Sequence, residues 1–196
     1  MKRLLAKNES LVEELYWNIH QDIIDKCKEK DREAQFHLYK LYSKSMYNTC
    51  LRITGNTAEA EDIIQEAFLS AFNKLDSYNG KVSFGSWLKK IVINKSLDSI
   101  KKKKRIVFET VQDDYIEDET TENETKISAQ HLKYALSELQ ENYKIIFSLY
   151  YLEGYDHDEI AEILKISTGA SRVQLLRAKN KLKIIISDIW KTNGDI

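Results

Sequence analysis

Two groups of basic side chains in this sequence could neutralise the phosphates of a nucleic acid. Residues 81–105 contain nine bases and one acid, Asp98, and residues 165–183 contain six bases and no acid. One such group is most often a solvated helix face, but each phosphate that Lys or Arg neutralises releases a counterion and so favours binding. Two groups on separate helices therefore predict contact with DNA at two places, although the net charge of the chain is only −1.

The second basic group begins with side chains that can read bases. Arg can bond twice to guanine and Gln twice to adenine in the major groove. Ser171, Arg172 and Gln174 are therefore candidate contacts to base edges. Three lysines further along suit phosphates: Lys179, Lys181 and Lys183. Three apolar residues are expected in the core instead: Leu175, Ala178 and Leu182.

The first basic group has aromatic residues near its start. Trp87 follows a polar loop, "DSYNGKVS" (residues 76–83), which contains Tyr78. Aromatic rings can stack on an unpaired base. A core position suits the amphipathic ring of Trp87 equally well, and Tyr78 could simply be a ring on the loop surface.

The elements that carry these residues are expected to be helices. The chain has no proline and six glycines, and no alternating strand pattern stands out. Apolar residues recur at helical spacing in residues 32–53, 56–75 and 84–105. Gly55 is the expected stop of the first helix, Asn56 and Glu59 form a possible capping box for the second, and Ser83 can cap the third.

The C-terminal part shows a helix-turn-helix pattern. Residues 127–139 and 141–152 are typical of two helices, and Gly154 follows as a stop. Asp156 is the expected cap of a short helix over 157–164, which a tight turn separates from a longer basic helix that begins near Thr168. A short helix, a turn of about three residues and a long basic helix are typical of this DNA-binding motif.

Residues 106–125 contain eight acids and no base, with few large apolar side chains. Charge of one sign opposes compaction, which predicts a flexible acidic linker. The fold class is therefore expected to be all-α, with two helical domains. The predicted divisions are an N-terminal extension (1–21), a first domain (22–105), the linker (106–126) and a second domain (127–190).

Several functional classes lack their signatures. Cys27 and Cys50 belong to no CxxC pair and the four histidines are scattered, so neither a metal site nor a cofactor is expected. A Gly-rich phosphate loop and a nucleophile elbow are both missing, which argues against an enzyme. No apolar run reaches membrane-spanning length and Glu9 interrupts any signal-peptide core, so the protein is expected in the cytoplasm without membrane insertion.

Three motifs resemble the extracytoplasmic-function sigma factors of bacteria, which belong to the sigma-70 family. They are "AEDIIQEAFLSAF", "SFGSWLKKIVINKSLD" and "EGYDHDEIAEILKISTGASRVQLLRAKNKL", and the likeness runs from about Ile23 to Ile185. The resemblance implies that the first domain is region 2, which binds the RNA polymerase core and melts the −10 promoter element. It implies that the second is region 4, which binds the −35 element and the polymerase flap.

The resemblance also assigns roles to residues. The contact with the clamp helices of the largest polymerase subunit falls on Asp62, Gln65 and Glu66, which would otherwise be an ordinary polar helix surface. Recognition of a flipped −10 base falls on Tyr78, Asn79, Gly80, Lys81, Val82, Ser83, Trp87, Lys90, Asn94 and Lys95. Contacts to the −35 element fall on Thr168, Ser171, Arg172, Gln174, Arg177 and Lys181. The linker would run through the RNA exit path, and an anti-sigma factor is an expected partner.

The sequence departs from the family pattern at three places. The helix that begins near "LQENYK" lacks the usual proline, Lys165 stands where glycine is common in the turn, and Ala170 stands where threonine is common. These differences affect the expected −35 preference more than the fold. A conventional helix-turn-helix regulator that binds duplex DNA without polymerase stays open as an alternative.

Overall fold

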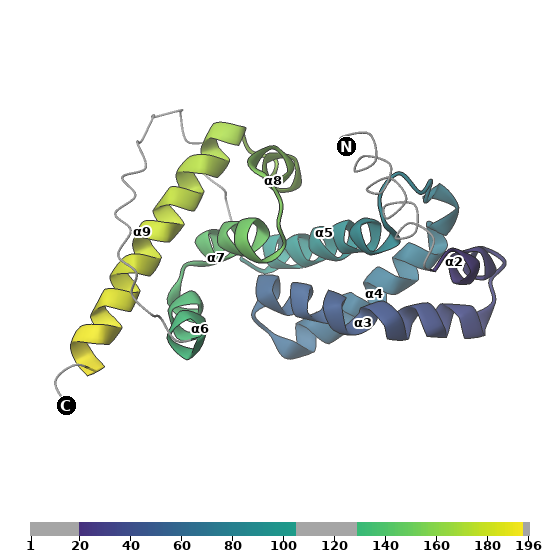
Figure 1. Ribbon diagram of the computed structural model, residues 1–196, viewed down its shortest axis with the longest axis horizontal. Coiled ribbons are helices and arrows are strands. Elements are labelled where there is room, and N and C mark those ends of the chain that lie inside the picture. Colours follow the sequence, from purple (N-terminus) through teal and green to yellow (C-terminus); the bar gives the residue numbers. More distant parts are fainter. Residues whose placement is uncertain (1–19, 105–128, 194–196) are drawn as a thin grey trace, which may run out of the picture. The chain divides into compact units, whose positions relative to one another are not determined.

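The computed structural model describes residues 20–104 and 129–193 (Figure 1). Within these two ranges the chain forms helices and turns and no strand. The all-α prediction is therefore confirmed. The chain divides into two compact units, residues 1–104 and 105–196. The expected N-terminal extension lies almost wholly outside the described residues, and the expected linker lies entirely outside them.

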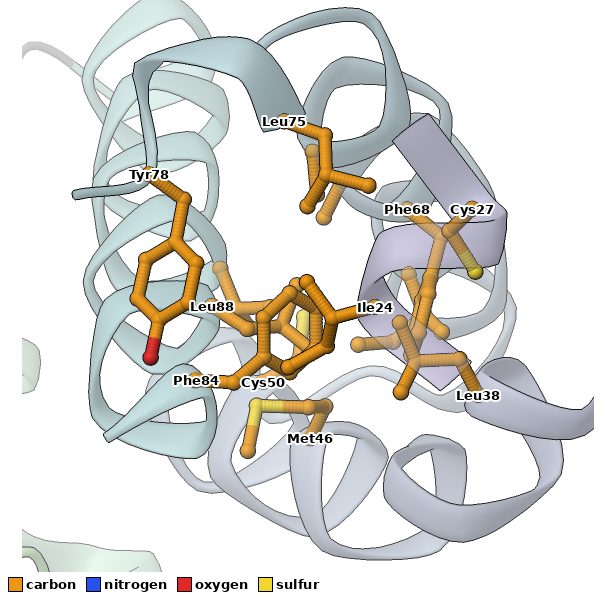
Figure 2. Close-up of a cluster of buried hydrophobic side chains, with 14 of the residues drawn as sticks. Ile24, Cys27, Leu38, Met46, Cys50, Phe68, Leu75, Tyr78, Phe84 and Leu88 are labelled. Carbon is orange, nitrogen blue, oxygen red and sulfur yellow. The ribbon is translucent and has the colours of Figure 1, made fainter. Parts of the chain in front are cut away.

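The first unit contains four α-helices among its described residues: α2 (Gln21–Lys28), α3 (Arg32–Thr54), α4 (Thr57–Asn73) and α5 (Phe84–Lys104). A single 3₁₀ turn, η1 (Leu75–Ser77), follows α4. Helices α3, α4 and α5 each pack against the other two, and α2 packs against α3. Their apolar sides form one core cluster, which includes Leu38, Phe68 and Leu88 (Figure 2).

The predicted helix ends of this unit follow from local chemistry. Gly55 ends α3 in the left-handed region at φ 67°, where a residue without Cβ meets no steric penalty. Asn56 Oδ1 then accepts a hydrogen bond from Glu59 N at 3.0 Å and so caps α4. The expected capping box is only half formed there, because the Glu59 carboxylate bonds instead to α5. Ser83 caps α5 as predicted, since its hydroxyl accepts from Ser86 N at 3.2 Å.

The second unit is arranged around one long helix, α9 (Thr168–Asn193). Helices α6 (Ala129–Glu138), α7 (Glu141–Phe147) and α8 (His157–Leu164) all pack against α9. A π-helical turn, η2 (Ser148–Leu152), continues α7. Gly154, at φ 79°, follows it as the sequence predicts. Buried residues of α7 and α8, among them Ile146 and Ile160, supply the apolar contacts.

Candidate functional site

The loop between η1 and α5 is held by bonds within itself. We name residues 78–83 the 78–83 loop. Tyr78 Oη donates to the Val82 carbonyl oxygen at 2.9 Å, and Lys81 N donates to Asn79 Oδ1 at 3.1 Å. Gly80 supplies the positive φ of 73° that the turn needs. The side chains of Asn79, Lys81 and Val82 are exposed, so the loop presents them on a shape that is set from inside.

Tyr78 does not occupy the surface position that the sequence left open for it. Its ring is only 6 % exposed and packs against the rings of Phe84 and Trp87, at centroid distances of 5.6 and 5.3 Å. Burial also raises the pKa of the phenol above its ordinary value. In this conformation the ring is unavailable for stacking on a base, because it is an internal support of the loop. The expectation that Tyr78 contacts DNA is corrected accordingly.

One side of α5 presents polar and aromatic groups next to this loop. Trp87, Lys90 and Asn94 are spaced at i, i+3 and i+7, which places them on one helix face, and we name them the α5 face. Lys90 and Asn94 are exposed, whereas Trp87 is half-buried against Phe84 at 5.6 Å. Part of the Trp87 ring therefore joins the core and part is accessible, so stacking on a base stays a prediction.

Two carboxylates of α4 bond to the basic end of α5. Lys95 Nζ lies 3.4 Å from Glu66 Oε2, and Lys103 Nζ lies 3.0 Å from Glu59 Oε2. The Ser99 hydroxyl also donates to Glu59. Lys95 and Glu66, assigned on the sequence to different partners, are therefore paired with each other. Both of these side chains keep accessible surface.

The exposed side of α4 carries Asp62, Gln65 and Glu66, opposite the buried Ile63, Ile64, Ala67 and Phe68. Leu69 continues the same line one turn later and is 64 % exposed. We name the four exposed residues the α4 face. Sequence reasoning missed Leu69, although its spacing from Asp62 and Gln65 places it on that side. A single exposed apolar side chain is common on protein surfaces, so Leu69 is notable only for its place beside the three polar residues.

In the second unit, side-chain bonds fix α8 against α9. Asp156 caps α8, as predicted, and it forms a complete capping box with Glu159. Lys165 ends that helix in the left-handed region, at φ 60° and ψ 50°. Ser167 Oγ then caps α9 by accepting from Ala170 N at 3.0 Å. The predicted helix-turn-helix is therefore present, with α9 as its second helix.

Two further bonds join the starts of these helices. Thr168 Oγ1 donates to Asp158 Oδ1 at 2.8 Å, and His157 Nδ1 lies 2.9 Å from Ser171 Oγ. The His157 ring also stacks against Tyr150 at 4.9 Å. Burial, aided by the nearby Arg172 guanidinium, lowers the pKa of His157 below its ordinary value. A neutral imidazole therefore holds the first turn of α9.

Two of the predicted base contacts on α9 are wrong for this structure. Ser171 is 0 % and Gln174 is 2 % exposed. Both lie on the stripe that continues through Ala178 and Leu182, which are buried as expected, so they face the other helices. Extending that 3.6-residue period backwards by two turns would have identified them. Arg172 and Lys181 are exposed, and Thr168 and Arg177 are half-buried.

Comparison with known proteins gives the family. Models of sigma-70 region 2 and of sigma-70 region 4 match residues 38–106 and 130–182. The ECF RNA polymerase sigma factor SigM of Bacillus subtilis is 30% identical over 155 residues, which cover 76% of this chain and 92% of SigM. This chain belongs to the extracytoplasmic-function (ECF) sigma factors. SigW of the same organism is 27% identical over 179 residues, covering 85% of this chain and 96% of SigW.

Solved structures share the fold of this sigma factor. CnrH, in complex with the cytosolic domain of CnrY, is 18% identical with a TM-score of 0.53, covering 85% of this chain and 96% of that one. RpoE of Bartonella quintana, in complex with the anti-sigma factor NepR, is 19% identical with a TM-score of 0.55, covering 77% and 95%. At this identity the likeness concerns the fold alone.

As an ECF sigma factor, the chain binds RNA polymerase core and promoter DNA and directs transcription initiation. The α4 face, the 78–83 loop and the α5 face belong to its region 2, and α8 and α9 belong to its region 4. Among the described residues no cluster of three or more His, Cys, Asp or Glu side chains could hold a metal. In the same ranges no helix is long and apolar enough to cross a membrane.

Proposed function

We propose that three separate surfaces divide the work of this ECF sigma factor. The α4 face binds the clamp helices of the polymerase core. The 78–83 loop and the α5 face recognise and melt the −10 element. Four side chains of α9 that keep accessible surface bind the −35 element: Thr168, Arg172, Arg177 and Lys181.

The observation that carries this proposal is that exposed side chains of different chemical type lie on different helices. The α4 face is acidic and apolar, which suits a protein partner rather than phosphates. The α5 face and α9 expose bases, amides and an aromatic ring, which suit nucleic acid. Ser171 and Gln174 are left out of the proposed −35 contacts because they are buried.

The Lys95–Glu66 pair fits the proposal only if Lys95 can change partner. An exposed ion pair at 3.4 Å contributes about 0–1 kcal/mol, so exchange for a phosphate carries little penalty. We therefore keep Lys95 among the −10 contacts, as a residue that reaches DNA when Glu66 engages the core.

The remaining assignments rest on the charge pattern and on the family. The domain limits of 22–105 and 127–190, with an acidic linker at 106–126, are proposed from the charge pattern of the sequence. From the resemblance we propose that this linker passes through the RNA exit path and that region 4 contacts the polymerase flap. An anti-sigma factor is a proposed partner, as for RpoE, which was solved with one. We also propose that the protein acts in the cytoplasm and has no catalytic activity of its own.

The test is a double substitution on the α4 face, Asp62→Ala with Gln65→Ala. We expect co-elution with polymerase core in gel filtration to be lost, while the circular dichroism spectrum stays unchanged because both side chains are exposed. Glu29→Ala with Glu33→Ala is the control, since it removes two exposed acids that lie outside α4. Unchanged core affinity in the double variant would contradict the assignment.

Permanganate footprinting separates this function from that of a regulator that acts on closed duplex. With core present, we expect reactive thymines at the −10 element of a bound promoter. A protein that binds the duplex tightly alone and leaves those thymines unreactive would be a conventional helix-turn-helix regulator.

A further inference from the structure

The Tyr78 hydroxyl links the two ends of the 78–83 loop. Figure 2 labels Tyr78 and Phe84 among the buried side chains of this unit. The Tyr78 ring packs against Phe84 and Trp87, both from α5, and its oxygen bonds to the Val82 carbonyl four residues later. The Val82 side chain itself is 50 % exposed. The carbonyl that precedes Ser83, the cap of α5, is thus held from inside while the side chains of the loop stay accessible.

The other bonds of this loop are more exposed. Lys81 N donates to Asn79 Oδ1, and Ser83 Oγ bonds with Ser86 Oγ at 2.9 Å, both at the surface. Water can compete for such bonds, whereas the Tyr78 bond is partly buried. Removal of the hydroxyl would therefore loosen the middle of the loop without removing a contact to solvent or to a partner.

We propose that Tyr78 is a positioning residue for base recognition, whose hydroxyl holds the 78–83 loop in the shape that discriminates among −10 bases. The inference rests on the proposed function, since it concerns the loop assigned there to the −10 element. A loop that is ordered before binding loses less conformational entropy on binding and accommodates a wrong base less readily. Tyr78 thus acts on specificity through the loop and without touching DNA.

The test compares Tyr78→Phe with wild type in the complete holoenzyme. The ring and its packing are kept and only the hydroxyl is lost. Open-complex formation is measured on promoter fragments that carry each of the four bases at each −10 position. We expect the ratio between the preferred and the next-best base to fall roughly three- to ten-fold, the range that one intramolecular hydrogen bond supports. Hydrogen exchange of the loop amides should accelerate in the free protein.

Tyr42→Phe is the matched control. Its ring packs on the same Phe84 at 5.3 Å, and within the described residues its hydroxyl makes no bond to the loop. We expect its base preference to match that of wild type. Asn79→Ala, which removes an exposed group of the loop together with its bond to Lys81 N, shows whether the loop takes part in base recognition at all.

The possible outcomes distinguish failure of the Tyr78 inference from failure of the proposed −10 role of the loop. If Asn79→Ala alters base preference and Tyr78→Phe does not, the inference is overturned and the proposed function stands. An equal loss of binding at every base in Tyr78→Phe also overturns it, because a purely structural role has that effect. If neither variant alters preference, the loop does not read the −10 element and the proposed assignment fails together with the inference.

Discussion

Lys165 adopts the left-handed conformation that ends α8, which costs an ordinary L-residue about 1 kcal/mol. Glycine meets no such steric penalty. We predict that Lys165→Gly raises the free energy of unfolding by up to about 1 kcal/mol, as measured by urea denaturation. Lys165→Ala removes the same charge but keeps the Cβ, so it should give no stabilisation. An equal gain in both variants would show that charge, and not backbone strain, is responsible.

His157 predicts a pH dependence of stability. Burial and Arg172 lower its folded pKa, while Asp156 and Asp158 oppose this shift less strongly. In the unfolded chain the pKa returns to about 6.5, so the unfolded state binds more protons just below that pH. The contribution of His157 is therefore complete above pH 6.5 and is lost as the pH falls below it.

The measurement is the unfolding free energy of His157→Asn and wild type between pH 7.5 and 5.5. Asn keeps a hydrogen-bonding group near Ser171 but does not titrate. We expect a shallower decline with acid in the variant. His37→Asn, at an exposed position on α3, is the control and should follow wild type. Parallel curves for His157→Asn and wild type would contradict the assigned role.

The burial of polar residues near the start of α9 was not predicted from the sequence. Lys165 was noted as a departure from the family pattern because glycine is common at its place in the turn, and the structure shows it in the left-handed region. Ser171 and Gln174 were misassigned because polar side chains on an apolar stripe can be buried, which is easiest where another helix supplies a hydrogen-bond partner. For Ser171 that partner is His157, which lies 14 residues earlier in the chain. Helical spacing places a residue on a face, but it does not reveal a bond between helices.

The contact between α4 and α5 depends on one largely buried carboxylate. The Glu59 side chain is 13 % exposed and bonds to Ser99 and Lys103. We predict that Glu59→Ala lowers the free energy of unfolding by about 2 kcal/mol, because bonds to a charged group are lost within a packed contact. Glu61→Ala, an exposed acid of the same helix, should change it by less than about 0.5 kcal/mol. Thermal unfolding of both variants checks this difference.

Helix starts and stops in this chain were predictable where one residue decides them. Gly55, Ser83 and Asp156 all act as expected, because a left-handed end or a side-chain cap involves only neighbours in sequence. The bonds of the Glu59 side chain were not predictable in this way, since the carboxylate bonds to Ser99 and Lys103 of α5 and does not complete the capping box of α4. Tyr78 was misplaced for a similar reason: its aromatic partners belong to the next helix.

The chain as a whole divides its proposed functional surfaces between two compact units. Region 2 holds the α4 face, the 78–83 loop and the α5 face, and region 4 holds the basic side of α9. The opposite charges of the linker and the basic helices cancel in the net charge, which is why composition alone indicates no DNA binding. Division into two units implies that the two promoter elements are read by side chains that can be altered separately.

This separation predicts that a substitution in region 4 affects binding only to promoter fragments that contain the −35 element. On a full promoter, Arg172→Ala should weaken holoenzyme binding by about 1–3 kcal/mol through loss of a base or phosphate contact. On a fragment cut to exclude the −35 element, the same substitution should have no effect, because its partner is absent. Asn79→Ala should weaken binding on both fragments. Fluorescence anisotropy at fixed salt gives both affinities, and a persistent Arg172→Ala effect on the short fragment would show that α9 contacts something other than the −35 element.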